Sequence, residues 1–285
     1  MSFFASILLA AITVGTWNGK WFPSGRAEHR ASETQEALTI AKAGVLLRDG
    51  LAKADPAGTN DVILCLNEIR GPNTAEKLIG AIGRTNLAVA VVTRYRRRDR
   101  FDMQQDVILT TLPIVSANWS KWKNSKDKTP PRGYARANLL FAPSVTGTVY
   151  AIHLKSNYGQ TSKKLADLNR AKRSLAAKQI VEQERIGKKK KSNPVIVAGD
   201  INADKWAKQF SEDTVFAIFE EGGFLNVMDL VDPISRITYP GRGKWAGTTL
   251  DYIFHRGFKA VGKPFVLPAE EISDHNPVFV NLDCQ

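Results

Sequence analysis

The chain has 285 residues, 43% of them apolar and 24% charged, which is ordinary for a globular protein and long enough for a large core. Its 40 Lys and Arg exceed its 28 Asp and Glu, and the net charge of +12 favours polyanionic partners such as nucleic acid, anionic lipid surfaces or polyphosphate. Two cysteines are too few for a disulfide scaffold and lack the spacing of metal ligands. Cys65 lies in the apolar run Val62–Leu66, which predicts a buried thiol; the alternative is a disulfide with Cys284.

The N-terminal stretch has two interpretations. Residues 1–11 are apolar and carry Ala-Ala near a plausible cleavage point, but they lack a basic segment before the apolar one. We expect a short secretion signal that ends near Ala11, and therefore a secreted or periplasmic protein rather than a cytoplasmic one. The alternative is that the whole stretch is a core element. No other segment is apolar enough to span a membrane, so we expect no stable membrane insertion and a monomer.

Short apolar runs alternate with longer amphipathic patterns along the whole chain. The runs that predict strands are Ile12–Trp17, Asp61–Leu66, Leu87–Tyr95, Val107–Thr111, Thr148–Leu154, Val195–Ala198, Leu250–Phe254 and Pro277–Asn281. The patterns that predict helices are Glu33–Leu51, Ala75–Ile82, Ser162–Ile186 and Lys205–Glu220. This alternation, without a Pro-, Gly- or Ser-rich linker, predicts one layered α/β domain over residues 12–285.

The two longest predicted helices have a clear apolar side in the sequence. In the first, we expect Leu38, Ala41 and Val45 to face the core. In the third helix, the residues expected to face inward are Leu165, Leu168, Leu175 and Ala176, and those expected to face outward are Lys164, Arg170, Lys172, Arg173 and Lys178. Polar, basic loops are expected at Arg96–Asp102 and Ser120–Arg132.

Four polar residues lie at or just beyond the C-terminal ends of predicted strands. They are Asn18, Glu68, His153 and Asp200. A rigid sheet holds such side chains in place, and function commonly collects there. Glu68 ends a buried strand, where a carboxylate is costly unless it is paired or binds a cation. Carboxylate and amide oxygens are the ligands that Mg²⁺ prefers, which predicts a magnesium site with Mn²⁺ as a substitute.

Further chemistry-bearing residues follow other apolar runs. Asp200 and Asn202 stand in a sharp Gly-Asp-x-Asn turn, where a carboxylate and an amide suit a water and a phosphate oxygen. His153 and His275 lie in polar clusters and suit proton transfer or phosphate contact. Asp251 is placed to fix a histidine tautomer. Taken singly, each residue is equally well explained as a turn residue, a helix cap or a solvated side chain.

The order of six blocks is more specific than any one of them. The blocks are Thr16-Trp17-Asn18, Leu66-Asn67-Glu68, His153-Leu154-Lys155-Ser156-Asn157, Gly199-Asp200-Ile201-Asn202, Leu250-Asp251-Tyr252-Ile253-Phe254 and Ser273-Asp274-His275-Asn276-Pro277-Val278. In this order they resemble the endonuclease/exonuclease/phosphatase superfamily, the fold family of pancreatic deoxyribonuclease, over nearly the whole chain. The resemblance implies a four-layer α/β/β/α sandwich: two packed mixed sheets flanked by helices, with the active site where the strand ends of both sheets meet.

The resemblance also implies a role for each residue of the site. Glu68 would be the main metal ligand, Asn18 would support the metal or its water, and Asp274 would be a further metal-site carboxylate or would hold its neighbours. Asp200 would orient and deprotonate the attacking water. The residues that would contact the phosphate are Asn202, His153 and His275, with Asp251 orienting His275 and one histidine protonating the leaving oxygen.

The sequence departs from the family pattern at one position and leaves another open. The family usually carries Gln where this chain has Asn67, a conservative change. Deoxyribonuclease-like relatives support one catalytic histidine with a carboxylate from the middle of the chain. Asp102 and Asp106 are both candidates for that carboxylate, and the sequence does not distinguish between them.

The substrate is indicated by the residues around these blocks. His153 with Lys155 is the deoxyribonuclease-like form of its block, and Lys155 and Asn157 are candidate phosphate contacts. Two basic loops with interleaved aromatics suit nucleic acid, or are simply solvated faces. The first loop contains Arg94, Tyr95, Arg96, Arg97, Arg98, Arg100 and Phe101, and the second contains Trp119, Lys121, Trp122, Lys123, Lys126 and Lys128.

Three functions remain open at this point. The favoured one is a metal-dependent DNA endonuclease of low sequence specificity, with RNA as an additional substrate. The second is a phosphomonoesterase, inositol-phosphate phosphatase or lipid phosphodiesterase of the same superfamily. The third, a nucleic-acid-binding module with a dead site, is disfavoured because none of the expected Glu, Asp and His residues is missing.

Overall fold

The structure is a computed structural model that describes residues 11–25, 31–97, 100–101, 104–125, 128–157, 161–185, 193–241 and 246–285. Residues 97, 100 and 101 are described by their backbone alone. The expected signal segment therefore lies outside the described residues, apart from Ala11. Asp102, Arg98 and Lys126 lie outside them as well.

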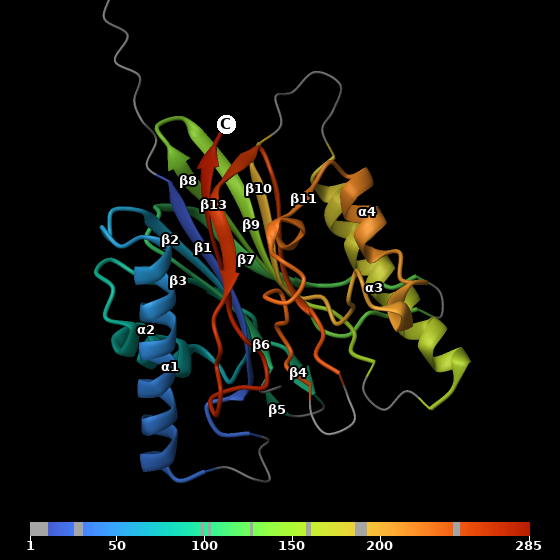
Figure 1. Cartoon of the computed structure of the whole chain (residues 1–285), viewed down its shortest axis with the longest axis horizontal. Helices are drawn as coiled ribbons and strands as arrows, with labels where there is room; N and C mark the ends of the chain where they lie inside the picture. Colours follow the sequence, from blue (N-terminus) through green and yellow to red (C-terminus); the bar gives the residue numbers. More distant parts are fainter. Residues whose placement is uncertain are drawn as a thin grey trace, which may run out of the picture.

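Two six-stranded mixed sheets pack face to face, and a pair of helices covers the outer face of each (Figure 1). The first sheet has the order β13 (Phe258–Val266), β14 (Val278–Cys284), β1 (Ile12–Phe22), β2 (Asp61–Ile69), β6 (Gln105–Thr110) and β3 (Ala88–Val92). The second has the order β11 (Leu225–Asn226), β12 (Asp251–Arg256), β10 (Val195–Asp200), β9 (Val145–His153), β8 (Gly133–Ala142) and β7 (Ile114–Lys121). The predicted four-layer sandwich is confirmed.

The outer layers are two helix pairs at opposite sides of the molecule (Figure 1). The first sheet is covered by α1 (Glu33–Ala54) and α2 (Pro72–Ile82), and the second by α3 (Lys163–Gln183) and α4 (Val215–Glu221). The remaining elements are a two-stranded hairpin of β4 (Arg96–Arg97) and β5 (Arg100–Phe101), and two 3₁₀ turns, η2 (Lys208–Phe210) and η3 (Val227–Leu230). No helix among the described residues is long and apolar enough to cross a membrane.

Strand β2 explains why its sequence is a continuous apolar run. Ile63 and Cys65 belong to the core between the two sheets, whereas Leu64 and Leu66 belong to the core under α1 and α2. A strand that is buried on both faces needs apolar residues at every position. Cys65 is a free, fully buried thiol and Cys284 is also free, so the predicted buried thiol is confirmed and a disulfide is not formed.

The parallel pairs bring the expected functional positions to one edge of the sandwich. β1 runs parallel to β2 with Asn18 opposite Asn67, and β9 runs parallel to β10 with His153 opposite Asp200. β12 runs antiparallel to β10, and its first residue, Asp251, lies opposite Asp200. The ends of five central strands therefore meet at the same edge of both sheets.

The predicted inner face of α1 is wrong. Leu38 and Val45 are 49% and 43% exposed, and the buried seam instead runs through Ile40, Ala43 and Leu47. Gly44 explains the difference, because a Cβ at this position would lie 2.5 Å from Ala81 on α2. Helices α1 and α2 approach each other at Gly44, so the side of α1 that carries Gly44 is the side that is buried.

Other segments also depart from the expected elements. The stretch Lys205–Glu220 is not one helix: it contains a turn, η2 and then the short α4. The Asp204 carboxylate accepts hydrogen bonds from the backbone N–H groups of Trp206 and Ala207, which favours a turn there. Three longer strands, β7, β8 and β13, are not predicted from the sequence, because polar residues interrupt their apolar pattern, and the two-residue strands β4, β5 and β11 are not predicted either.

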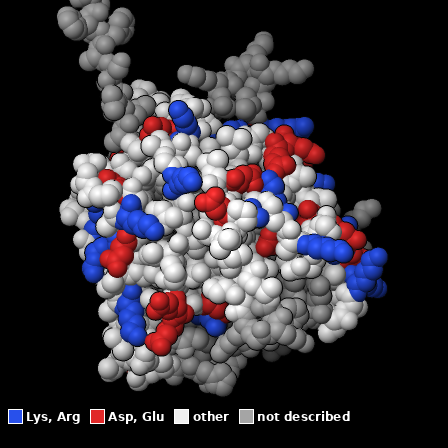
Figure 2. Space-filling model, viewed as in Figure 1, with Lys and Arg blue, Asp and Glu red and all other residues white. Residues whose placement is uncertain are grey.

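The expected basic loops include short strands, and two of their aromatic residues, Tyr95 and Trp122, are part of the core. Arg96 and Arg97 begin the β4–β5 hairpin, and Lys121 ends β7. Tyr95 and Trp122 are buried, so the expectation that they contact bases or sugars is wrong. On the face shown in Figure 2, Lys and Arg alternate with Asp and Glu, so the net positive charge is not gathered there into one patch.

Candidate active site

Buried polar residues from both sheets converge at the edge where the central strands end. Asn18, His153, Asp200 and Asp251 are all at most 2% exposed, although each carries a polar or ionisable group. Buried groups of this kind are costly unless they bind one another or a ligand. This density of buried polar groups marks the candidate site.

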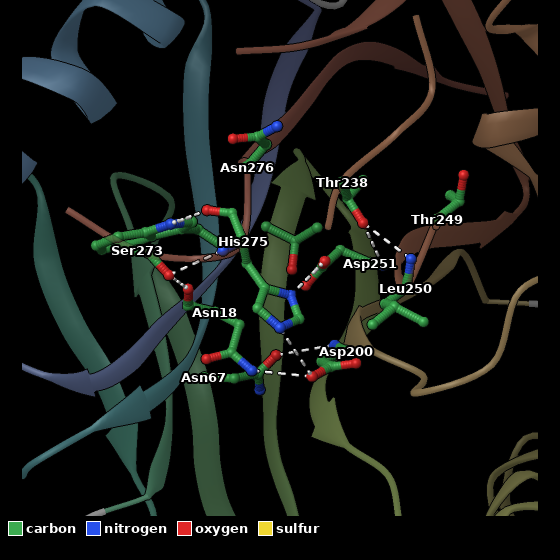
Figure 3. Close-up of polar contacts among 12 residues, drawn as sticks. Asn18, Asn67, Asp200, Thr238, Thr249, Leu250, Asp251, Ser273, His275 and Asn276 are labelled. Atoms are coloured by element: carbon green, nitrogen blue, oxygen red, sulfur yellow. Dashed lines mark hydrogen bonds and ion pairs between the residues drawn. The ribbon is translucent and has the colours of Figure 1, made fainter. Parts of the chain in front are cut away.

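The carboxylate of Asp200 is the meeting point of these side chains (Figure 3). Its Oδ2 accepts a hydrogen bond from Asn18 Nδ2 at 2.9 Å, and lies 3.5 Å from His153 Nε2 and 3.9 Å from His275 Nε2. Its Oδ1 accepts from the backbone N–H of Asn202 at 2.8 Å. One carboxylate thus faces an amide and two imidazoles that come from three different segments of the chain.

Glu68 lies beside this cluster. Its Oε1 is 3.4 Å from Asn18 Nδ2 and 3.8 Å from His153 Nε2, and its Oε2 accepts from the backbone N–H of Trp21 at 3.0 Å. Glu68 and Asn202 have backbone φ angles of 58° and 56°, values that are unusual for residues other than glycine. Strained conformations of this kind cluster at functional sites, because the surrounding structure must hold them.

His275 is fixed by a carboxylate behind it and by the backbone around it. Its Nδ1 is 2.8 Å from Asp251 Oδ2, which leaves Nε2 facing Asp200 (Figure 3). Ser273 Oγ accepts the backbone N–H of His275 and donates to the carbonyl of Asn18. Thr238 Oγ1 accepts the backbone N–H of Asp251. No sequence pattern marks the hydroxyl groups of Ser273 and Thr238 as supports of the site, because their contacts depend on tertiary structure.

The surroundings separate the pKa values of the two histidines. Burial, followed by the nearby charges of Arg132, His275 and Lys155, lowers the pKa of His153 well below its ordinary value. Burial also acts to lower the pKa of His275, but Asp251 and Asp200 outweigh it and raise that pKa to about 10. One imidazole is therefore neutral and the other charged, a division of states that suits acid–base chemistry.

Asn67 connects the two sheets directly beneath the site. Its Oδ1 accepts the backbone N–H of Asp200 at 2.9 Å, and its Nδ2 donates to Asp106 Oδ1 at 2.7 Å. Asp106 also accepts from the hydroxyl of Tyr95, and burial raises its pKa to about 7. These contacts make Asp106 a support for Asn67. Among the described residues His153 Nδ1 has no hydrogen-bond partner, and Asp102, the other candidate for that position, lies outside them.

Gly199 allows Asp200 to sit against the neighbouring strand. Its φ is 144°, and a Cβ there would lie 1.9 Å from the carbonyl oxygen of Ile152 and 2.9 Å from Asn67 Oδ1. Gly199→Ala is expected to lower the free energy of unfolding by about 2 kcal/mol or more, because both strain and a backbone clash are introduced. Chemical denaturation measures this loss, and activity should fall with it as Asp200 moves.

The matched control is Gly80→Ala on α2, where a Cβ meets nothing within 4 Å. Alanine has the higher helix propensity, so this variant is expected to be as stable as wild type or more stable by up to about 1 kcal/mol. Equal stability of the two variants would contradict the role assigned to Gly199.

The chemistry of the donor set fits a hard divalent cation. Glu68 and Asp200 supply carboxylate oxygens, the kind of ligand that Mg²⁺ prefers, and the Asn18 NH2 group donates to both of them. Asp200, Asp251 and His275 also have potential ligand atoms within 4.8 Å of one another, but His275 Nδ1 faces Asp251 in that group. We therefore regard the side of the cluster with Glu68 as the better fit for a metal.

The other residues expected at the site lie around its rim. Asp274 forms an ion pair with Lys20, with a distance of 2.9 Å between Oδ2 and Nζ. Lys155 is half-buried close to His153 in the chain, and the side-chain Oδ1 of Asn157 accepts a hydrogen bond from Arg173. Asn202 Nδ2 donates to the carbonyl of Leu154. Arg94 and Arg96 are exposed, and the side chain of Arg97 is outside the described residues.

A comparison with known families identifies the family of the chain. The sequence profile described as the Endonuclease/Exonuclease/phosphatase family matches residues 15–275. The chain belongs to this family. Its members hydrolyse phosphate esters and generally use divalent metals, so the chain is a phosphoester hydrolase. A comparison with curated protein sequences finds no match.

Solved structures of the family share the fold at low sequence identity. A family protein from Leptotrichia buccalis has 16% identity and a TM-score of 0.64, covering 96% of this chain and 100% of that one. D. rerio TDP2, complexed with a single-strand DNA product, has 13% identity and a TM-score of 0.61, covering 96% and 99%. Sphingomyelinase C from Streptomyces griseocarneus has 17% identity and a TM-score of 0.58, covering 95% and 99%.

Proposed function

We propose that this protein is a divalent-metal-dependent phosphodiesterase that acts on DNA as an endonuclease of low sequence specificity. The observation that carries the proposal is the convergence on Asp200 of Asn18, His153 and His275, with distances of 2.9 to 3.9 Å to one carboxylate oxygen. A buried carboxylate that faces two imidazoles and an amide can orient a water molecule in front of a phosphorus atom.

Each side chain has a role in this reaction. Asp200 orients the attacking water and accepts its proton. His153 and His275 donate hydrogen bonds through Nε2 to the phosphoryl and leaving oxygens, and Asp251 holds the orientation of His275. Asn202, two residues after Asp200, contacts the scissile phosphate. These donors stabilise the negative charge that builds on the phosphoryl oxygens during in-line attack.

Glu68 holds the divalent cation, which we propose to be Mg²⁺ with Mn²⁺ as a substitute, and Asn18 supports the metal site by donating to the Glu68 and Asp200 carboxylates. When bound, the cation supplies positive charge to the phosphoryl oxygens. Trp21 orients Glu68 through its backbone N–H, and the hydrogen bond from the Lys20 N–H orients Asn18. Asp274 is a further carboxylate at the rim, where it forms an ion pair with Lys20.

The choice of DNA is supported by charge and by the rim of the site. The net charge of +12 attracts a polyanion, and the exposed Arg94 and Arg96 and the half-buried Lys155 provide cations for phosphate contact. Asn157 follows Lys155 in the same segment and is a further candidate contact. The structural likeness to TDP2 bound to a DNA product is consistent with this substrate class.

Nicking of supercoiled plasmid tests the proposal. We expect cleavage in Mg²⁺ or Mn²⁺, loss of cleavage in EDTA, and recovery when the metal is added back. Activity should fall steeply as salt is raised, since phosphate contacts are screened. A panel of linear DNA, RNA, an inositol phosphate and sphingomyelin is assayed in parallel. Hydrolysis of a panel lipid or inositol phosphate with intact nucleic acid would overturn the DNA assignment and leave the hydrolase class.

A further inference from the structure

An arginine lies flat on a tryptophan beside the candidate site. The guanidinium carbon of Arg236 is 3.6 Å from the ring centroid of Trp206. Trp206 in turn lies nearly parallel to the buried Tyr252, with 6.2 Å between centroids and 23° between planes. Both Arg236 and Trp206 are half-buried. Stacking of this kind holds a guanidinium in one orientation while its N–H edge stays free to bind an anion.

Arg236 has no carboxylate partner among the described residues. No ion pair between described residues involves Arg236, although the neighbouring Lys205 is paired with Glu220 and Asp229. A fixed guanidinium without a carboxylate partner suits bidentate binding of a phosphate group. The basic loops with interleaved aromatics that the sequence predicts lie near β4, β5 and β7, whereas Trp206 follows β10 and Arg236 precedes β12.

The backbone around the stack connects it to the site. Buried Asp204 accepts hydrogen bonds from the backbone N–H groups of Trp206 and Thr249, and the Thr249 hydroxyl donates to the carbonyl of Arg236. Thr249 stands two residues before Asp251, on the far side of Asp251 from His275 in Figure 3. These contacts connect the stack to the segment that leads into Asp251.

We propose that Arg236, held on Trp206, forms a second phosphate-binding subsite. It takes a phosphate of a nucleotide next to the cleaved bond, an assignment that rests on the proposed function. The subsite makes the protein prefer a polynucleotide strand over a small phosphodiester that has no second phosphate. Because it lies outside the reacting group, it acts on substrate binding.

The test compares an oligodeoxynucleotide with bis(4-nitrophenyl) phosphate for wild type and Arg236→Gln. We expect the ratio of kcat/KM for the oligonucleotide to that for the small diester to fall roughly tenfold to a hundredfold, as for loss of one charged hydrogen-bonded contact. Arg236→Lys keeps the charge but loses the planar fork, and Trp206→Leu removes the support, so both should give intermediate losses. Arg48→Gln is the control: it removes the same charge on the exposed side of α1, away from the subsite.

Binding of a fluorescent oligonucleotide in EDTA is a second readout that needs no hydrolysis. We expect weaker binding by Arg236→Gln and a slope of log affinity against log salt that is smaller by about one, the value for one lost phosphate contact. An unchanged ratio and an unchanged slope, as for Arg48→Gln, would overturn the subsite. Wild type that binds the oligonucleotide through Arg236 in this assay but leaves DNA uncut would overturn the nuclease proposal and retain the subsite.

Discussion

Asp200→Asn is expected to lower kcat for phosphodiester hydrolysis about a hundredfold to ten-thousandfold, the usual effect of losing a general base. The amide keeps the shape of the side chain, and its single oxygen can accept from Asn18 Nδ2 while the hydrogen bond from the Asn202 N–H is lost. It cannot take the proton of the attacking water. Steady-state kinetics on the oligonucleotide in saturating Mg²⁺ measures the change, and KM should move much less than kcat.

Two measurements distinguish this effect from unfolding or loss of charge. Burial raises the pKa of Asp200 to about 7, which means that the ionised carboxylate is disfavoured in the folded protein. The metal-free variant should therefore unfold in EDTA at a temperature no lower than wild type. Asp232→Asn, an exposed position, removes one charge outside the site and should keep full activity. A kcat within threefold of wild type for Asp200→Asn would remove Asp200 from the mechanism.

Arg173→Met is expected to lower the free energy of unfolding by about 3 to 5 kcal/mol, the typical cost of breaking a buried ion pair from one side. Arg173 and Asp213 have fully buried side chains, and the guanidinium contacts Asp213 through Nε and a terminal nitrogen. The other terminal nitrogen donates to the carbonyl of Lys155 and to Asn157 Oδ1, at 2.7 and 2.9 Å. Denaturant unfolding measures the loss.

Two further variants separate the ion pair from simple truncation. Arg170→Met, one turn earlier on α3, removes a cation that pairs with Asp167 and Glu212 near the surface, and should cost less than about 1 kcal/mol. The double variant Arg173→Met, Asp213→Leu removes both buried charges and should recover much of the lost stability. If the double variant is as unstable as Arg173→Met alone, the unpaired charge of Asp213 is not the cause of the lost stability.

Arg173 also illustrates where the sequence was insufficient. A charged residue on an amphipathic helix normally faces solvent, so the sequence predicts Arg173 on the outer face of its helix. The structure shows instead that Arg173 is fully buried. Its partner, Asp213, lies 40 residues away and has no pattern that marks it. The inner face of α1 was wrong for a related reason, because Gly44 and its contact with Ala81 become visible only when α2 is in place.

The strand ends were predictable because burial and chemistry agree there. A long apolar run such as Val195–Ala198 that stops at Gly199-Asp200 predicts a carboxylate at the edge of a sheet, and the structure brings Asp200 together with Asn18 and His153. The supports of the site were not predictable. Thr238 and Ser273 act through single hydroxyl groups on backbone atoms that only the folded chain brings near.

The strands that escaped prediction have a common cause. In β8, Arg136 and Asn138 alternate with small and apolar residues, and β7 is exposed along much of its length. Such sequences form strands because a neighbour supplies the hydrogen bonds, as β9 does for β8. Their own composition gives little signal, which is why neither β7 nor β8 is predicted from the sequence.

The two ends of the chain meet at the site. The indole N–H of Trp17 donates to the carbonyl of His275, 258 residues later in the sequence, and the Ser273 hydroxyl donates to the carbonyl of Asn18. A polypeptide that is still being synthesised has no complete site until the segment that carries Ser273 and His275 has left the ribosome and can pack against Trp17 and Asn18.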